Sequence, residues 1–317
     1  MGNLQAHKRA APGQCIIGAF MPVTVTIAKV LLKLLPAVPR AEYLPLDRIT
    51  LNVAMERARQ ENEDERAGGL LKFFGEEPRI KAEMTLDLGC GFGGRTVEFQ
   101  RRTDGYVIGL EIDYRVSMFA SRFALAADSE RPLFLAGVGE RLPLVSDSID
   151  LILSYDVLEH VEEPSFCLTE CWRVLKPGGL LLAVFPPYFH PTGAHLEGYV
   201  SRLPYANLLF PKRVLIRAID EILSERNDGF RPQALRPNDK LYCLNGLTLR
   251  RFNRLIRQSG FEVVSLGLAP LFSGLNRNYE AWRMRYYAWL FRPLSRIPIL
   301  QECFTHRVIA LLRKPNG

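Results

Sequence analysis

A glycine-rich turn between an expected strand and an expected helix constrains this chain more than any other feature. The apolar run Met84–Leu88 leads into Gly89–Gly93, where three glycines alternate with other residues. Glycine accepts a positive φ angle and lets a ligand approach the backbone closely. Asp87 stands near the end of the expected strand, where a carboxylate can meet a cation or a hydroxyl group. Such a turn indicates a nucleotide-like ligand only weakly by itself.

Strands and helices alternate around this turn. Apolar runs predict strands at residues 84–88, 106–111, 133–136, 149–154, 180–185, 261–268 and 307–312. Helices are predicted at 55–66, 116–127, 166–175 and 247–259, and Lys176–Gly179 ends the third of them by proline and glycine chemistry. Continuous apolar strands that alternate with helices favour an α/β fold whose parallel sheet is covered on both faces.

The alternation breaks on either side of this region and divides the chain into four segments. Residues 1–80 are expected to form a helical extension that faces a membrane or the substrate, and 81–185 the ligand-binding core. Residues 186–246 are rich in Pro, Tyr, Arg and His and are expected to form a lid over the carboxyl ends of the strands. Residues 247–317 complete the sheet and carry an aromatic and basic helical stretch at Arg277–Arg296.

Size and composition fit a globular cytoplasmic protein. The 317 residues allow one or two domains, and the net charge of +7 permits an acidic partner or an anionic membrane surface without requiring either. The six cysteines show no paired metal-ligand spacing. Cys167 and Cys171 share one face of a helix, which indicates core packing, and the absence of a disulfide pattern favours a reducing compartment.

The N-terminal apolar stretch from Cys15 to Ala28 follows two basic residues and resembles a weak leader or anchor. It is too short to span a bilayer, which takes about 20 residues. We expect an amphipathic helix that ends at Pro36 and docks on a surface or touches a membrane, with packing on the protein's own core as the alternative. Its apolar side chains, opposed to Lys29 and Lys33, are Val30, Leu31, Leu34 and Leu35.

Five blocks occur in order along the chain: Asp87–Gly93, Gly109–Asp113, Gly139–Leu144 with Ser148–Asp150, Asp156–Val161 and Arg173–Gly179. Together they resemble class I S-adenosylmethionine (SAM)-dependent methyltransferases, in the branch that contains the ubiquinone- and menaquinone-biosynthesis enzymes. The resemblance covers Met84–Phe185 well and Leu247–Lys314 loosely. It implies a Rossmann-like, doubly wound fold with a seven-stranded, mostly parallel sheet, helices on both faces, an N-terminal helical extension and a lid insertion after the fifth strand.

The resemblance also implies SAM as the cofactor and a role for each matching residue. The glycine turn would lie under the methionine part, with Asp87 near its amino group, and Glu111 would hold the ribose hydroxyls. Ile112 would pack on the adenine, Gly139 and Glu140 would line its edge, and the backbone after the fourth strand would border the methionine arm. The implied cofactor-binding residues are Asp87, Gly89, Cys90, Gly91, Gly93, Glu111, Ile112, Gly139, Glu140, Ser154 and Tyr155.

Two local features adjust this picture. Val138 stands where family members often carry an aspartate for the adenine amino group, so backbone or another side chain must meet that group. Phe185–Tyr188 looks like the Pro-Pro-Tyr motif of amide and adenine N-methyltransferases, but that motif follows the fourth strand and this segment follows the fifth. We therefore reject a nucleic-acid N-methyltransferase and expect no nucleic-acid partner.

Histidines after the fourth and fifth strands are the candidate catalytic residues. An oxygen or ring-carbon acceptor loses a proton during methylation, so a nearby general base helps. His195 is the predicted base and His160 the second candidate, with ordering of a turn or packing of a lid as the structural alternatives. A metal held by His190 and His195 would lack a clear third ligand, so no metal site is expected.

The predicted function is therefore a SAM-dependent methyltransferase that acts on an oxygen, or a ring carbon, of a small or lipid-like acceptor. A catalytically inactive SAM-binding scaffold or regulator is the alternative, and the blocks after the third strand disfavour a nicotinamide dehydrogenase. Peripheral membrane contact is an option through the N-terminal helix or the aromatic stretch with Tyr279, Trp282, Tyr286 and Trp289. The sequence leaves the acceptor and the oligomeric state open.

Overall fold

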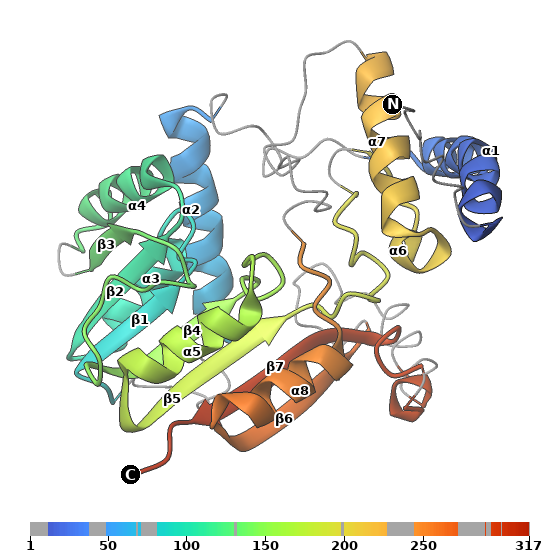
Figure 1. Cartoon of the computed structure of the whole chain (residues 1–317). Coiled ribbons are helices and arrows are strands. Elements are labelled where there is room, and N and C mark those ends of the chain that lie inside the picture. Colours follow the sequence, from blue (N-terminus) through green and yellow to red (C-terminus); the bar gives the residue numbers. More distant parts are fainter. Residues whose placement is uncertain are drawn as a thin grey trace, which may run out of the picture.

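The computed structural model describes residues 12–37, 49–67, 69–70, 81–129, 132–197, 200–226, 244–271, 289, 293–298 and 300–316. Its centre is a seven-stranded sheet of order β3-β2-β1-β4-β5-β7-β6 (Figure 1). The strands are β1 (Met84–Leu88), β2 (Tyr106–Glu111), β3 (Leu133–Ala136), β4 (Ile149–Tyr155), β5 (Leu175–Phe185), β6 (Glu262–Pro270) and β7 (Thr305–Arg313). The first five pair in parallel, and β7 pairs antiparallel with both β5 and β6, which confirms the expected mostly parallel sheet.

Helices cover both faces of this sheet. The helices of the described residues are α1 (Pro12–Leu34), α2 (Leu51–Arg66), α3 (Gly94–Arg101), α4 (Tyr114–Ala126), α5 (Pro164–Val174), α6 (Ala206–Leu209), α7 (Lys212–Arg226) and α8 (Leu249–Ser259), with a 3₁₀ turn at Leu294–Arg296. Of these, α1, α6 and α7 lie apart from the sheet. On β4, Ile152 points into the core shared with α5 and α8, while Leu151 and Leu153 point into the core shared with Phe99 of α3. Successive strand residues face opposite sides, so one apolar strand fills two cores.

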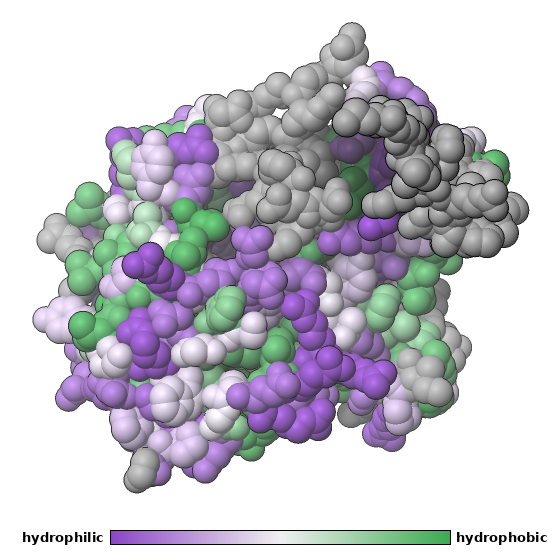
Figure 2. Space-filling model, viewed as in Figure 1, coloured by the Kyte–Doolittle hydropathy of each residue, from purple (hydrophilic) through white to green (hydrophobic). Residues whose placement is uncertain are grey.

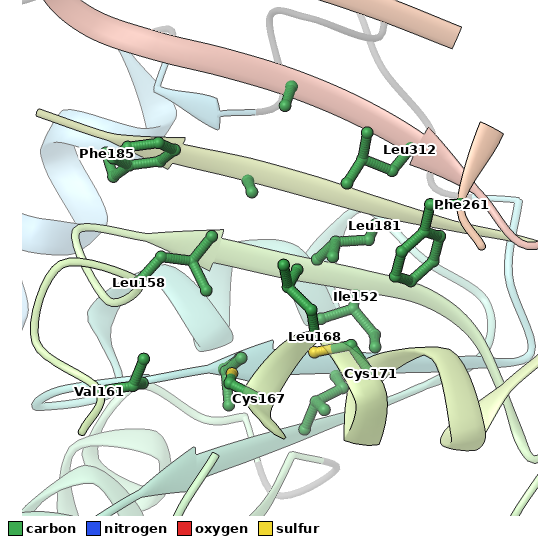
Figure 3. Packing of buried hydrophobic residues seen from close by; sticks show 14 of the residues in the cluster. Ile152, Leu158, Val161, Cys167, Leu168, Cys171, Leu181, Phe185, Phe261 and Leu312 are labelled. Carbon is green, nitrogen blue, oxygen red and sulfur yellow. The ribbon is translucent and has the colours of Figure 1, made fainter. Parts of the chain in front are cut away.

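The core beneath α5 and α8 is the larger of the two. Figure 3 shows side chains from the sheet, including Ile152 and Leu181, meeting Leu168 and Cys171 of α5. Cys167 and Cys171 are fully buried, as their shared helical face predicts. The exposed side of α8 carries Arg250, Arg254 and Arg257, and Figure 2 shows hydrophilic side chains over this part of the surface.

One strand boundary differs from expectation. β5 begins at Leu175, directly after α5, and not after the Lys176–Gly179 stop. Gly178 has a φ of 79°, and the pairing with β4 shifts register between Ile149 and Leu151, so the strand starts with an irregularity. Lys176 lies 2.8 Å from the Asp150 carboxylate, which ties the irregular start to β4. The proline and glycine residues thus belong to the irregular start of β5, whereas the sequence pattern predicts a strand that begins only at residue 180.

The two N-terminal helices pack on different parts of the molecule. α2 lies against α3, where a Cβ atom on Gly94 would clash with the backbone of Ala58. The Asn62 amide donates to the Gly94 carbonyl at 2.9 Å. α2 therefore belongs to the sheet region and supports the helix that follows the glycine turn.

α1 packs instead on α7, in a second cluster that we call the cap: α1, α6 and α7 with Ala194, Leu196, Val200 and Leu244. The cap lies at one end of the molecule, away from the helices around β1 to β3 (Figure 1). Lys29 of α1 pairs with Glu221 and Glu225 of α7 at 2.9 and 2.6 Å. Helices nearly 200 positions apart in the sequence thus form one unit.

α1 packs on α7 through a neighbouring face and leaves much of the predicted apolar face exposed. Val25, Ala28 and Leu32 are buried against α7, whereas Val30 and Leu34 are 55% and 66% exposed. Burial of these three side chains favours the contact, and Lys29 and Lys33 pair with α7 glutamates at its edge. Among the described residues, no helix combines the length and apolar character needed to cross a bilayer. Most of Arg277–Arg296, including Tyr279, Trp282 and Tyr286, lies outside the described residues.

Candidate functional site

The glycine turn connects β1 to α3 at the carboxyl end of the parallel strands. Gly89, Gly91 and Gly93 have φ angles of 73°, 54° and 83°, in the left-handed region that side chains disfavour. A Cβ atom on Gly89 would clash with Val157, and one on Gly93 would lie 2.7 Å from the Cβ of Ala120. The turn therefore requires glycine for both conformation and space.

Glu111, at the end of β2, reaches the glycine turn. Its carboxylate accepts hydrogen bonds from the backbone N–H of Gly91 at 3.1 Å and of Ile112 at 2.8 Å. Burial raises its pKa, and the backbone donors oppose that rise. Ile112 is 56% exposed beside it, so an apolar surface is available where the adenine is predicted to pack. The Glu111 carboxylate and the exposed Ile112 side chain thus lie next to the turn, where the ribose and the adenine are predicted to bind.

Asp87 lies beneath the same turn and is buried. The Thr96 hydroxyl donates to its carboxylate at 2.7 Å. Burial raises the pKa of Asp87 to about 7, although the Thr96 hydrogen bond and the nearby Arg95 charge both lower it. A positively charged ligand group would favour the ionised form, so Asp87 is poised to respond to one.

Two further charged residues, Glu61 and Arg95, lie at the turn but belong to none of the five sequence blocks. Glu61 of α2 accepts a hydrogen bond from the backbone N–H of Gly94 at 3.1 Å, and burial raises its pKa. The Arg95 guanidinium lies over the ring of Tyr155 at 4.5 Å, within 3.9 Å of Glu65. Arg95 directly follows the turn and could have been suspected, whereas only long-range packing of α2 brings Glu61 here.

This charge pattern fits the methionine end of SAM. Asp87, Glu61 and Glu111 bring three carboxylates to the turn, and Arg95 adds one guanidinium. A zwitterionic amino acid with a sulfonium carries two positive groups and one carboxylate, which these side chains complement. A pyrophosphate at the turn would face the carboxyl groups of Asp87 and Glu61, which repel it when they are ionised. The site therefore suits SAM better than a dinucleotide.

The other predicted cofactor residues occupy more varied places. Glu140 accepts hydrogen bonds from the backbone N–H of Glu162 and Glu163 at 2.5 and 3.2 Å, so its carboxylate holds the turn before α5. Gly139 lies close to Cys167, where a Cβ atom would be 3.0 Å from the sulfur. The remaining residues of this set are Cys90 and Ser154, both buried, and Tyr155, which lies between two arginines. Val138, which stands in place of the family's aspartate, is 40% exposed.

The two candidate catalytic histidines meet in space. The rings of His160 and His195 lie 5.1 Å apart in an edge-on arrangement, although 35 positions separate them in the sequence. His195 has a φ of 51°, an uncommon conformation for a residue other than glycine. Burial, followed by the charges of His160 and Arg307, lowers its pKa well below the ordinary value. His190 lies instead near His306, at 5.3 Å between ring centres.

Arg307 of β7 links these histidines to the cofactor side. Its guanidinium donates to Asp156 at 3.0 Å and lies 5.8 Å from the centre of the Tyr155 ring. Asp156 has a φ of 56°, so the chain turns sharply at the end of β4. The sequence analysis did not single out Arg307, because the antiparallel insertion of β7 beside β5 brings it here.

Comparisons with known proteins agree with this geometry. Residues 86–183 match the family model described as a methyltransferase domain. Over 123 residues the chain is 40% identical to an uncharacterized methyltransferase of Mycobacterium bovis, covering 38% of this chain and 46% of the relative. Over 112 residues it is 31% identical to a ubiquinone biosynthesis O-methyltransferase of Rhizobium rhizogenes, covering 34% and 44%. The chain thus spans less than half the length of these curated relatives.

A solved structure shows the same fold. The complex of a geranyl diphosphate methyltransferase with GPP and sinefungin superposes with a TM-score of 0.50 at 15% identity, over 80% of this chain and 77% of that one. The glycine turn and strands β2 to β4 lie within the residues that match the family model, and β1 and β5 lie at their two ends. Residues 86–183 are therefore similar to a methyltransferase domain, and the sheet around them has a Rossmann-like fold.

Proposed function

We propose that the protein is a SAM-dependent methyltransferase that transfers a methyl group to an oxygen, or a ring carbon, of a small or lipid-like acceptor. The observation that carries this proposal is the convergence of Asp87, Glu61 and Glu111 with Arg95 at the glycine turn. The bound cofactor would supply an activated methyl group on its sulfonium. The protein's own task is to hold both partners in line and to exclude water.

The acceptor is proposed to lie on the side of His160 and His195. Both histidines lie beyond the carboxyl ends of β4 and β5, and Val157 connects this region to Gly89. Because its pKa is low, His195 is neutral at pH 7 and can accept a hydrogen bond from an acceptor hydroxyl. Its role as general base stays a prediction, since a low pKa also makes it a weak base.

A lipid-like acceptor, met at a membrane surface, is part of the proposal. Its support is a row of exposed apolar side chains on α1 at helical spacing: Val23, Ile27, Val30 and Leu34, which are 50–66% exposed. Such a row can lie in the interface of a bilayer. The similarity to a ubiquinone biosynthesis O-methyltransferase, whose name indicates an oxygen acceptor, also favours O-methylation over C-methylation.

Transfer of a labelled methyl group tests the proposal. The purified full chain is incubated with methyl-labelled SAM and a panel of phenols, quinols and fatty acids, with and without anionic vesicles. Label in the organic extract is expected, and Gly89→Ala should abolish it, whereas the solvent-exposed Glu83→Ala should not. Binding of S-adenosylhomocysteine without transfer to any acceptor would favour the scaffold alternative.

A further inference from the structure

The sequence analysis expects no metal because it considers His190 together with His195. The structure groups His195 with His160 and Glu159 instead. One ligand atom from each of these three residues lies within 4.8 Å of the others, and no ion is present. Glu159 and His160 come from the turn after β4, and His195 from the segment after β5. Two separate parts of the chain therefore converge on one small region.

The Glu159 carboxylate is the unexplained group of this cluster. Its residue is only 3% exposed, and neither carboxylate oxygen accepts a hydrogen bond from the residues that the structure describes. The His160 ring offers only a long contact of 3.7 Å. Burying a carboxylate without hydrogen bonds is costly, and native proteins resolve this by protonating the group, pairing its charge or binding a metal.

The neighbouring charges leave room for a cation. Arg307 is the guanidinium near Glu159, but it donates to Asp156 at 3.0 Å and faces Tyr155. With neutral imidazoles, the charges of Glu159, Asp156 and Arg307 sum to one negative charge. A divalent ion would make the site singly positive, which suits one anionic ligand such as an ionised acceptor oxygen.

The donor set selects the kind of ion. Two imidazole nitrogens and one carboxylate oxygen are ligands for Zn²⁺, Mn²⁺ or Fe²⁺, whereas Mg²⁺ and Ca²⁺ prefer oxygen alone. Around tetrahedral Zn²⁺ such atoms lie about 3.3 Å apart, given metal–ligand distances of about 2.0 Å. Closure from within 4.8 Å requires a small rotation, which the His160 side chain, 37% exposed, has space to make. Three protein ligands would leave a position open for the acceptor.

We propose that Glu159, His160 and His195 form a binding site for a divalent transition-metal ion, at which an oxygen of the methyl acceptor is held. The part that concerns the acceptor rests on the proposed function, while metal binding stands by itself. The acceptor hydroxyl would release its proton to solvent and bind as an oxyanion. Its oxygen would then form the bond to the methyl carbon as the carbon–sulfur bond of SAM breaks, leaving S-adenosylhomocysteine.

Binding of Zn²⁺ and Co²⁺ to the metal-free full chain tests the site. Calorimetry should give one Zn²⁺ per chain, and Co²⁺ should show the visible absorption of a protein-bound, low-coordinate ion. Glu159→Gln, His160→Asn and His195→Asn should each weaken Zn²⁺ binding at least tenfold. Glu163→Gln, a carboxylate four positions further along, and His306→Asn, outside the cluster, should leave the affinity unchanged.

Absence of stoichiometric Zn²⁺ binding, or equal affinity in the variants and the wild type, would overturn the proposal. His160→Asn keeps the test decisive if Glu159→Gln does not fold, because His160 is partly exposed. S-adenosylhomocysteine binding is measured in the same samples and should not change in Glu159→Gln. Retained cofactor binding and methyl transfer in the absence of bound metal would defeat this inference alone. Metal binding without methyl transfer would instead defeat the proposed function.

Discussion

The sheet region and the cap differ in how much of their structure can be predicted from the sequence. In the sheet region, short apolar runs and a glycine turn already contain the boundaries of β1, β2 and β3. In the cap, α1 and α7 meet only because Val25, Ala28 and Leu32 find partners on a helix nearly 200 positions away. The proposed cofactor residues lie in the first region, while the proposed acceptor side draws on both regions. The family of reaction is therefore readable, and the acceptor is not.

The largest effect on cofactor affinity is expected from Gly89→Ala, with Gly246→Ala as its matched control. Both glycines have positive φ angles, 73° and 71°, so the conformational cost of alanine is similar. A Cβ atom at Gly89 would clash with Val157, whereas one at Gly246 meets nothing within 4 Å. We expect a loss of about 100-fold in S-adenosylhomocysteine affinity for Gly89→Ala, measured by calorimetry. Equal effects of the two substitutions would mean that the turn does not hold the cofactor.

The next effect is a pH dependence set by Asp87. In the free protein its pKa is about 7, and a bound ammonium group would lower it, so cofactor binding releases a proton. Affinity for S-adenosylhomocysteine should rise by up to about tenfold per pH unit below pH 7 and level off above it. Because the folded protein holds this proton more tightly than the unfolded chain, the Asp87 contribution to stability falls as pH rises from about 4 to about 7.

Asp87→Asn tests this pH dependence, because it removes the titrating carboxyl group and keeps the shape of the side chain. Its affinity for S-adenosylhomocysteine should not change between pH 5.5 and 8, because binding then releases no proton from this position. Asp104→Asn, at the amino end of β2, should keep the wild-type slope. A slope that persists in Asp87→Asn would assign the proton to another group, with Glu61 the first to examine.

The smallest effect on cofactor affinity is expected from substitutions in the cap. Leu32→Ala removes a fully buried side chain between α1 and α7 and should destabilise the cap by about 2–5 kcal/mol. Leu34→Ala, on the exposed side of the same helix, should change stability by less than about 0.5 kcal/mol. Hydrogen exchange of α1 and α7 reports the loss, while S-adenosylhomocysteine affinity should stay within twofold. A parallel loss of affinity in Leu32→Ala would show that the two regions are coupled.

Particular residues show why prediction from the sequence reaches only part of the site. Asp87, the three glycines and Glu111 lie at or next to strand ends, where continuous apolar runs and a turn of small residues reveal them. Glu61 and Arg307 arrive through packing of α2 on α3 and through the antiparallel insertion of β7, neither of which leaves a local signal. Glu159 is adjacent to a predicted residue, but its lack of hydrogen bonds is visible only once the surroundings are known.

The same limit applies to the cap. The amphipathic character of α1 is visible in the sequence, yet the face that packs depends on the apolar side of α7, which carries Ala218, Ile219 and Ile222. Because both sides of α1 carry apolar residues, periodicity alone could not select between them. Knowledge of the partner helix is needed, and that knowledge comes only from the tertiary structure.

Calorimetry with S-adenosylhomocysteine and with NAD tests the central claim most directly. We predict single-site binding of S-adenosylhomocysteine, no heat with NAD, and an affinity about 10- to 100-fold weaker in Glu111→Ala. Glu83→Ala, whose side chain is 88% exposed, should bind like the wild type. Binding of NAD in place of S-adenosylhomocysteine, or no loss of affinity in Glu111→Ala, would contradict the assignment of the glycine turn to the methyl donor.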